Sequence, residues 1–181
     1  MGGVGIKREL KKAMGKSTAH ITKLQIGCGY DNFEGYINVD IDPNSKADLI
    51  CDANRLPFDS NYFTEIYAHH SLEHFKDLKT IVEELARVSK NGCIWDIVVP
   101  YYTWGMNIIN PYHHIYFNED TFRFWDDIYK REQPKWFKLE TLNVSFDFNK
   151  ELYGEDADFE RLLKTNINVC REISFKIKVH K

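Results

Sequence analysis

The stretch that decides the fold is residues 24–29, which run Leu-Gln-Ile-Gly-Cys-Gly. An apolar run leads directly into a Gly-x-Gly turn, and glycines at such a turn let the backbone approach a ligand closely. The chain then enters a second apolar run, which ends in Val39-Asp40-Ile41-Asp42. An acidic residue at the end of a second strand can accept hydrogen bonds from both hydroxyls of a ribose. We therefore expect a nucleoside site where these two strands end.

Short apolar runs that end in glycine or aspartate continue along the chain. Strands are predicted at 23–27, 36–41, 47–50, 63–68 and 93–99. Between the last two, Asp77 is the expected N-cap of a helix with apolar residues on one face, and Asn91-Gly92 is expected to close it. A strand, a helix and a strand in this order favour a parallel unit in an α/β sheet.

The two ends of the chain carry weaker signals. Residues 6–16 have the apolar spacing of a short helix. After Pro100, the composition becomes aromatic, and we predict a loop at 100–117 followed by a short helix capped by Asn118. The remaining elements are predicted as a strand near 136–148, an acidic helical stretch near 155–168 and a final strand near 172–179.

Composition and charge limit the classes of protein. With 181 residues, of which 43% are apolar, the chain is expected to form one globular domain. A net charge of -3 offers no positive field for nucleic acid, and no run approaches the roughly 18 apolar residues of a membrane span. The four cysteines have no zinc-binding spacing. We expect a cytoplasmic protein with reduced thiols and no nucleic-acid or membrane partner.

Residues 23–126 resemble the class I S-adenosylmethionine-dependent methyltransferases. The resemblance rests on LQIGCG, NVDID, ICDANRLPF and the run 63–68 followed by SLEHF. It implies a Rossmann-like methyltransferase sheet, mostly parallel with an antiparallel C-terminal strand, and S-adenosylmethionine as cofactor. Residues 1–181 would form a single such domain, with an N-terminal helix within 1–20 and an acceptor-side insertion at 100–135.

The resemblance also implies the cofactor-binding residues. The glycine turn would border the methionine part of the cofactor, with Tyr30 capping the site, and Asp40 would hold the ribose. Ile41 would pack on the adenine, while Asp52 and Ala53 would meet its edge. His69, just past the fourth strand, would face the methionine or sulfonium. The complete predicted set is Gln25, Gly27, Cys28, Gly29, Tyr30, Asp40, Ile41, Asp52, Ala53 and His69.

The chain departs from the usual pattern of this family around the first turn. Gln25 stands where an acidic residue is usual, Thr64 where aspartate is common, and no third glycine follows Gly29. Only about eight residues, 28–35, separate the first two strands, fewer than the dozen or so of a helical crossover. We therefore predict that a loop replaces the first crossover helix. A glycine that lets that helix pack closely is then not needed.

Histidines provide the candidates for catalysis. Five of the seven fall in two segments expected at the mouth of the site, namely His69, His70, His74, His113 and His114. A positioned histidine can remove the proton of a hydroxyl acceptor. We rank His113 first as the base, followed by His70 and His114. Tyr101, Tyr102, Trp104 and Tyr112 are candidates for the wall of the acceptor site.

Three other classes of protein compete with this interpretation. His70-x-x-Glu73-His74 matches a zinc-hydrolase signature, but it follows directly on a strand, whereas zinc ligation needs both histidines inside a helix, so we predict no metal. A dinucleotide oxidoreductase would lack the helix N-terminus that holds a pyrophosphate. A non-catalytic nucleoside-binding protein remains open.

The expected reaction is methyl transfer to a small molecule, with oxygen as the preferred acceptor atom. The compact form without a first crossover helix is similar to methyltransferases associated with surface-polysaccharide synthesis. By that resemblance, the acceptor is a sugar or a phosphorylated or nucleotide-activated precursor. The sequence gives no indication of the oligomeric state.

Overall fold

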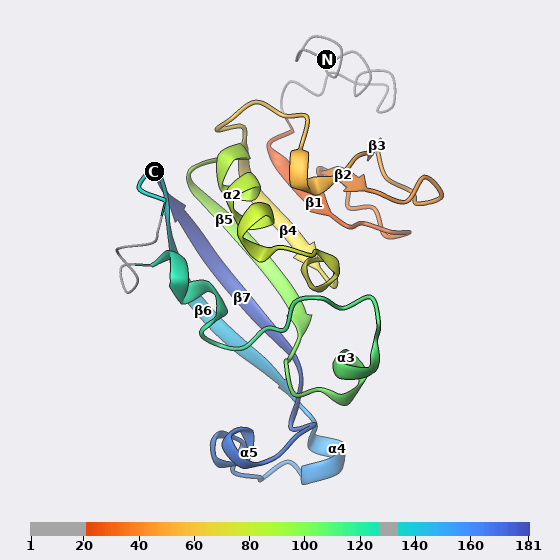
Figure 1. The fold of residues 1–181 in the computed structure, drawn as a ribbon, viewed down its shortest axis with the longest axis vertical. Helices are drawn as coiled ribbons and strands as arrows, with labels where there is room; N and C mark the ends of the chain where they lie inside the picture. Colours follow the sequence, from red (N-terminus) through yellow and green to blue (C-terminus); the bar gives the residue numbers. More distant parts are fainter. Residues whose placement is uncertain (1–20, 127–133) are drawn as a thin grey trace.

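The centre of the fold is a seven-stranded sheet in the order β3-β2-β1-β4-β5-β7-β6 (Figure 1). The computed structural model describes residues 21–126 and 134–181. The strands are β1 (Lys23–Ile26), β2 (Ile37–Asp40), β3 (Leu49–Ile50), β4 (Phe63–His69), β5 (Ser89–Pro100), β6 (Lys138–Phe148) and β7 (Cys170–His180). Strand β7 is antiparallel to β5 and β6, and the pairs formed by β1 to β5 are parallel. The predicted sheet, mostly parallel with an antiparallel C-terminal strand, is confirmed.

Among the described residues, the helical elements are short, apart from one that packs on the sheet. They are η2 (Ala53–Arg55), η3 (Leu72–His74), α2 (Leu78–Val88), α3 (Gly105–Ile109), η4 (Thr121–Trp125), α4 (Lys150–Tyr153) and α5 (Phe159–Thr165). As predicted, Asp77 caps α2, with its carboxylate accepting from Lys79 N at 3.0 Å. The apolar face of α2, including Ile81 and Leu85, is fully buried in the core. The predicted helix at 6–16 lies outside the described residues.

A loop joins β1 to β2. Residues 27–36 are all described and none is helical, so the predicted loss of the first crossover helix is confirmed. The side-chain amide of Gln25 holds this loop: Nε2 donates to Asp31 O at 2.8 Å, and Oε1 accepts from Phe33 N at 3.2 Å. Asn38 Oδ1 also accepts from Phe33 N, at 3.0 Å. The loop is therefore ordered by buried side chains of the strands that it joins.

The end of α2 differs from the prediction. The helix ends at Val88 and β5 begins at Ser89, so Asn91 and Gly92 lie within the strand rather than closing the helix. Ser89 Oγ donates to Leu85 O at 2.8 Å and accepts from Trp95 Nε1 at 2.9 Å, which ends the helix earlier. A register shift between β4 and β5 accommodates the extra residues as a bulge.

Residues 100–126 and the tail also differ in detail from the prediction. The predicted loop at 100–117 contains α3, and the helix expected after Asn118 is the 3-10 turn η4, which begins at Thr121. Asn118 Oδ1 accepts from Asp120 N and Thr121 Oγ1, both at 3.1 Å, and so orders the approach to η4. The acidic stretch predicted near 155–168 contains α5, and a second short helix, α4, precedes it; both lie at one end of β6 and β7 (Figure 1).

The two faces of β4 have different environments. Ile66 and Ala68 are fully buried in the same core as α2, whereas Tyr67 and His69 alternate with them and are half-buried on the opposite face. The direction of the chain after β4 therefore decides which histidine reaches the carboxyl ends of the strands. Within residues 21–126 and 134–181, no helix has the length and apolar character needed to cross a membrane.

Candidate active site

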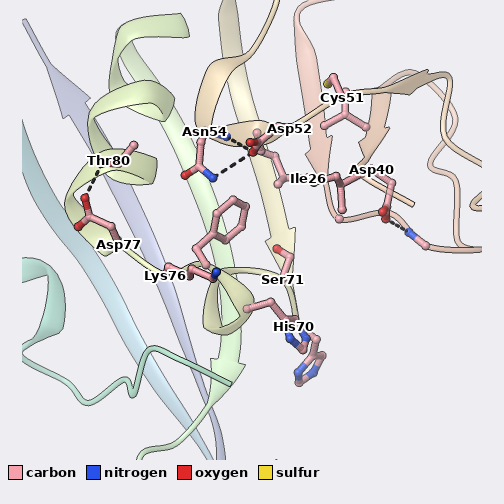
Figure 2. A pocket seen from close by; sticks show the side chains of 17 residues that line it. Ile26, Asp40, Cys51, Asp52, Asn54, His70, Ser71, Lys76, Asp77 and Thr80 are labelled. Carbon is pink, nitrogen blue, oxygen red and sulfur yellow. Dashed lines mark hydrogen bonds between the residues drawn. The ribbon is translucent and has the colours of Figure 1, made fainter. Parts of the chain in front are cut away.

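A first cavity of about 830 Å³ lies at the carboxyl ends of β1 and β2, beside the segment that joins β4 to α2 (Figure 2). It is lined by Ile26, Gly27, Gly29, Val39, Asp40, Ile41, Cys51, Asp52, Ala53, Asn54, His70, Ser71, His74, Phe75, Lys76, Asp77 and Thr80. Small-molecule and cofactor sites typically have volumes of about 300–1,000 Å³. The first cavity therefore has the size of a cofactor site, in the crevice where open α/β sheets bind ligands.

The glycine turn shapes one wall of the first cavity. Gly27 and Gly29 have φ angles of +63° and +52°, in the region that favours glycine. A Cβ atom on Gly27 would come within 2.5 Å of Ser71 Cβ, so this residue has no room for a side chain. Gly29 N donates to Asp40 Oδ2 at 2.7 Å, which ties the turn to the end of β2.

Two carboxylates face the first cavity from neighbouring strand ends (Figure 2). Asp40 Oδ1 accepts from Asp42 N at 2.8 Å. Asp52 Oδ1 accepts from Asn54 N at 2.9 Å and from Asn54 Nδ2 at 3.0 Å. These bonds orient both side chains. Because a carboxylate offers about four lone-pair positions, each retains capacity to accept from the hydroxyls or the amino group of a nucleoside.

Ser71 provides a direct test of whether the first cavity fits a polar ligand. Its side chain is buried, and Oγ has no hydrogen-bond partner among the described residues. Buried hydroxyl groups normally have a partner, so a lone buried hydroxyl in a cavity wall indicates that a ligand supplies one. Together with the two oriented carboxylates, this hydroxyl gives the donor and acceptor groups that an adenosyl amino acid requires.

A second cavity of about 490 Å³ adjoins the first. It is lined by His70, Pro100, Trp104, Met106, Asn107, Ile109, Asn110, Pro111, Tyr112, His113, Arg171 and Glu172. His70 lines both cavities and therefore stands between them. The second cavity combines aromatic side chains with one guanidinium and one carboxylate, a mixture suited to a polar ligand with an apolar face.

His70 has a strained backbone and two acidic neighbours. Its φ is +48°, uncommon for a residue other than glycine and often found at functional positions. Nε2 lies 3.1 Å from Glu172 Oε1, and Nδ1 lies 3.7 Å from Glu73 Oε1. The Glu73 carboxylate, followed by that of Glu172, raises the pKa of His70 above its ordinary value, although burial opposes this effect.

His113 is held by a buried amide. Its Nδ1 lies 2.6 Å from Asn107 Oδ1, while Asn107 Nδ2 donates to Tyr101 O at 3.2 Å. The amide orientation makes Oδ1 the acceptor, so Nδ1 of His113 carries the proton and Nε2 carries the lone pair. Burial lowers the pKa of His113, which favours the neutral ring. His74 packs edge-on against it, with ring centroids 4.8 Å apart.

Comparison with known proteins gives the class of the chain. Residues 24–95 match the family model described as a methyltransferase domain. The match covers the glycine turn, both acidic strand ends and α2, and it confirms the predicted enzyme class and cofactor, a methyltransferase that uses S-adenosylmethionine. A comparison with curated protein sequences found no match.

Solved structures share the fold of this methyltransferase at low sequence identity. A SAM-dependent methyltransferase from Archaeoglobus fulgidus is 18% identical, with a TM-score of 0.60, and the alignment covers 98% of this chain and 94% of that one. Phosphoethanolamine N-methyltransferase 2 from Haemonchus contortus, solved with phosphomonomethylethanolamine and S-adenosylhomocysteine, is 15% identical with a TM-score of 0.58. That alignment covers 87% of this chain and 48% of the other. These likenesses confirm the predicted fold class.

The predicted cofactor residues of the methyltransferase divide into two groups. Gly27, Gly29, Asp40, Ile41, Asp52 and Ala53 line the first cavity together. Gln25 and Cys28 are buried and do not line it, and Tyr30 is exposed outside it. His69 also lies away from the cavity: its ring stacks on Tyr67, and its Nε2 lies 3.2 Å from Asp96 Oδ1 on the opposite face of the sheet.

The candidate bases are also separated by the structure. His70 lines both cavities, His113 lines the second cavity alone, and His114 is exposed and lines neither. Of the four aromatic residues expected at the acceptor wall, Trp104 and Tyr112 line the second cavity. Tyr101 is buried, with its hydroxyl donating to Glu119 at 3.0 Å, and Tyr102 lies outside the cavity.

Three residues that line the cavities were not predicted from the sequence. They are Ser71, which belongs to the SLEHF segment, and the pair Arg171 and Glu172. The last two stand at the beginning of β7, which runs antiparallel to β5. The amino end of an antiparallel strand lies beside the carboxyl ends of the parallel strands next to it. The predicted topology was therefore sufficient to place Arg171 and Glu172 near the expected ligand site.

Proposed function

We propose that this methyltransferase transfers a methyl group to an oxygen of a small molecule bound in the second cavity. The acceptor that we propose is a sugar, or a phosphorylated or nucleotide-activated sugar precursor, of the kind used in surface-polysaccharide synthesis. The observation that carries this proposal is the position of His70, which lines the cofactor-sized first cavity and the second cavity at once. A group there can contact both reactants.

The lining of the second cavity supports a sugar-like acceptor. Trp104 and Tyr112 offer aromatic faces to the apolar face of a sugar ring, and Glu172 can accept hydrogen bonds from its hydroxyls. Arg171 donates from one terminal nitrogen to Asn149 Oδ1 at 3.1 Å and lies 3.0 Å from Glu151 Oε2. A guanidinium has five N–H donors, so Arg171 retains donors for a phosphate group.

The chemistry requires little of the protein beyond positioning and proton removal. Bound S-adenosylmethionine would supply an electrophilic methyl group on a sulfonium. The chain orients the acceptor oxygen and excludes water, and orientation can supply on the order of 7–11 kcal/mol in favourable cases. His70, with its ring fixed by Glu172, is the base that we propose for the acceptor hydroxyl, in preference to His113, which lines only the second cavity.

The acceptor is tested by measuring formation of S-adenosylhomocysteine with a panel of compounds. The panel contains free sugars, sugar phosphates and nucleotide sugars, with phosphoethanolamine, a protein mixture and RNA as other acceptor classes. We expect turnover with one of the sugar classes and methylation of oxygen, identified by mass spectrometry and NMR of the product. Turnover confined to phosphoethanolamine, protein or RNA would show that the acceptor proposed here is wrong.

The base is tested with His70→Asn. We expect turnover to fall at least about 100-fold while the affinity for S-adenosylhomocysteine stays within a few-fold, because a positioned base typically contributes 100- to 10,000-fold. His180→Asn is the matched control, since His180 lies at the far end of β7 and pairs with Glu140. Unchanged turnover in His70→Asn would remove His70 from proton transfer.

A further inference from the structure

Glu73 is a buried carboxylate without a hydrogen bond. Its side chain is 1% exposed, and neither Oε1 nor Oε2 has a hydrogen-bond partner among the described residues. His70 Nδ1, at 3.7 Å from Oε1, is too distant for a hydrogen bond. An ionised carboxylate removed from water is strongly destabilising unless a cation or a hydrogen-bond donor compensates it. Among the described residues, His70 offers Glu73 a charge partner at 3.7 Å when its ring is protonated, but no group donates a hydrogen bond to the carboxylate.

The segment 112–115 is fixed against Glu73 by main-chain contacts. His114 N and Ile115 N both donate to Glu73 O, at 2.8 Å and 3.2 Å. These bonds bring His113 over η3, although the two segments are far apart in sequence. Main-chain hydrogen bonds therefore hold the backbone next to His113 beside that of Glu73 and His74.

In both His74 and His113, Nδ1 makes a hydrogen bond, which leaves Nε2 as the ring nitrogen that can bind a metal ion. His74 Nδ1 lies 3.1 Å from Tyr112 O, and a carbonyl oxygen only accepts, so Nδ1 carries the proton. His113 Nδ1 donates to Asn107 Oδ1, as described above. Each imidazole thus has its lone pair on Nε2. Metal-binding histidines are typically held in this way, with the second ring nitrogen donating to a carbonyl or amide oxygen.

Glu73, His74 and His113 lie close enough to share one ion. One potential ligand atom from each residue lies within 4.8 Å of the others. We propose that these three residues form a binding site for a divalent transition-metal ion of the Zn²⁺ type. Two imidazoles and one carboxylate are a known donor set for Zn²⁺, with ligand distances near 2.0–2.2 Å, and the ion would neutralise the buried Glu73 carboxylate.

The proposed metal site lies at the boundary of the two cavities. His74 lines the first cavity and His113 lines the second. Three protein ligands leave at least one coordination position open, which is the arrangement of catalytic rather than structural zinc sites. We infer that the open position takes an oxygen of the acceptor. This role rests on the proposed function, whereas the metal site itself does not.

This site differs from the motif visible in the sequence. The motif His70-x-x-Glu73-His74 would use His70 as a ligand, and the sequence context led us to predict no metal. In the structure, residues 70–74 include a strand exit with a positive φ at His70 and a 3-10 turn, so His70 and His74 do not share a helix face. His113, from the loop after β5, takes the place of His70.

The metal site is tested on the full chain without an affinity tag, after removal of metals with a chelator. Calorimetric titration with Zn²⁺, without cofactor or acceptor, is expected to show one site per chain. Glu73→Gln and His113→Gln are expected to weaken binding by more than about 100-fold, beyond the 10- to 100-fold typical of outer-shell changes. Asn107→Ala is expected to fall within that 10- to 100-fold range. His114→Gln, which changes the exposed neighbouring histidine, is the control and should bind as wild type.

A second measurement needs no variant. X-ray absorption of the Zn²⁺-loaded wild-type protein is expected to show two imidazoles, oxygen ligands and no sulfur. Zn²⁺ binding that is equal in wild type and Glu73→Gln, a sulfur ligand, or the absence of stoichiometric binding would each overturn the proposed site. Because these readouts do not involve methyl transfer, failure of the metal site is distinguishable from failure of the proposed function.

Discussion

At Gly27, two independent constraints act on one residue. The backbone has a φ of +63°, and the space of a Cβ atom is already taken by Ser71 Cβ. Gly29 has a similar φ of +52° but no atom within 4 Å of a built Cβ. The two glycines of the turn therefore separate the cost of backbone conformation from the cost of a steric clash.

Gly27→Ala is expected to destabilise the protein more than Gly29→Ala. Both changes place alanine in the left-handed region, which costs about 1–2 kcal/mol. Gly27→Ala adds the clash with Ser71, and overpacking typically adds about 1–3 kcal/mol. Urea unfolding of the two variants measures the difference in the free energy of unfolding. Equal losses of stability would mean that Ser71 moves aside without cost.

Asp40→Asn is expected to weaken binding of S-adenosylhomocysteine by about 10- to 100-fold, since a hydrogen bond to a charged group contributes about 1.5–3 kcal/mol. Asp42→Asn is the matched control, because Asp42 follows in the same turn but does not line the first cavity. Calorimetry gives both affinities. An equal effect of the two substitutions would show that Asp40 does not contact the ligand directly.

The neighbouring residues His69 and His70 show which site residues could be predicted from the sequence and which could not. Glycines and aspartates at strand ends were predictable, because the turn and the strand end fix their direction. The prediction for His69 ignored strand alternation: Ile66 and Ala68, two buried apolar residues in the second half of β4, point to one side of the strand, and His69 points to the other. Applied to the sequence, that alternation would have favoured His70 over His69.

At the scale of elements, the contact between β1, β4 and the loop before β2 depends on Glu65. This residue of β4 receives a hydrogen bond from Tyr36 and lies 2.9 Å from Lys23 Nζ of β1. Burial alone would raise the pKa of Glu65, but Tyr36 and Lys23 outweigh it and lower the pKa below its ordinary value of 4.5. The ionised form of Glu65 therefore stabilises this part of the sheet.

The stability that Glu65 contributes is expected to depend on pH. Because its pKa is lower in the folded state, the contribution is complete above pH 4.5 and is lost as the pH falls through the lowered value. Urea unfolding of wild type and Glu65→Gln should differ most near neutral pH and converge in acid. Tyr36→Phe, which removes one donor, should reduce this dependence. A difference that stays constant with pH would contradict the assignment.

Element boundaries were harder to predict than element order. Asn91-Gly92 has the composition of a helix end, yet the helix ends earlier because Ser89 bonds both Leu85 and Trp95. That contact joins α2 to the sheet and is invisible in local sequence. By contrast, the short spacing between the first two strands was sufficient to predict the missing crossover helix, since chain length alone sets that limit.

At the scale of the whole molecule, the core encloses the thiols. Cys28, Cys93 and Cys170 are buried, and Cys51 is half-buried in the wall of the first cavity. Burial raises the pKa of Cys28 and Cys93 to about 11 and that of Cys51 and Cys170 to about 12. None of the four forms a disulfide in the structure.

The native protein is therefore expected to resist thiol labelling near neutral pH. A pKa raised from 9.0 to about 11 lowers the thiolate fraction about 100-fold, and access is restricted as well. Labelling with a chromogenic disulfide should be slow in buffer and should reach four thiols in denaturant. S-adenosylhomocysteine should further protect Cys51. Rapid labelling of the native protein would indicate local opening of the core.

The strand order brings together residues that are far apart in the sequence and belong to no common sequence motif. The second cavity needs His70 from the end of β4, the loop after β5, and Arg171 with Glu172 from β7. The strand order was predictable from the family resemblance. The meeting of Glu73, His74 and His113 was not, because it depends on main-chain bonds between distant segments.

Arg171 and Glu172 are carried by a strand that is hydrogen-bonded on both sides, while α3 and its exposed apolar residues form a separate rim. In the proposed acceptor site, the polar groups thus stand on the sheet, and the apolar groups stand on a short helix. Exchange of α3 is therefore expected to change the apolar side of that site and to leave Arg171 and Glu172 in place.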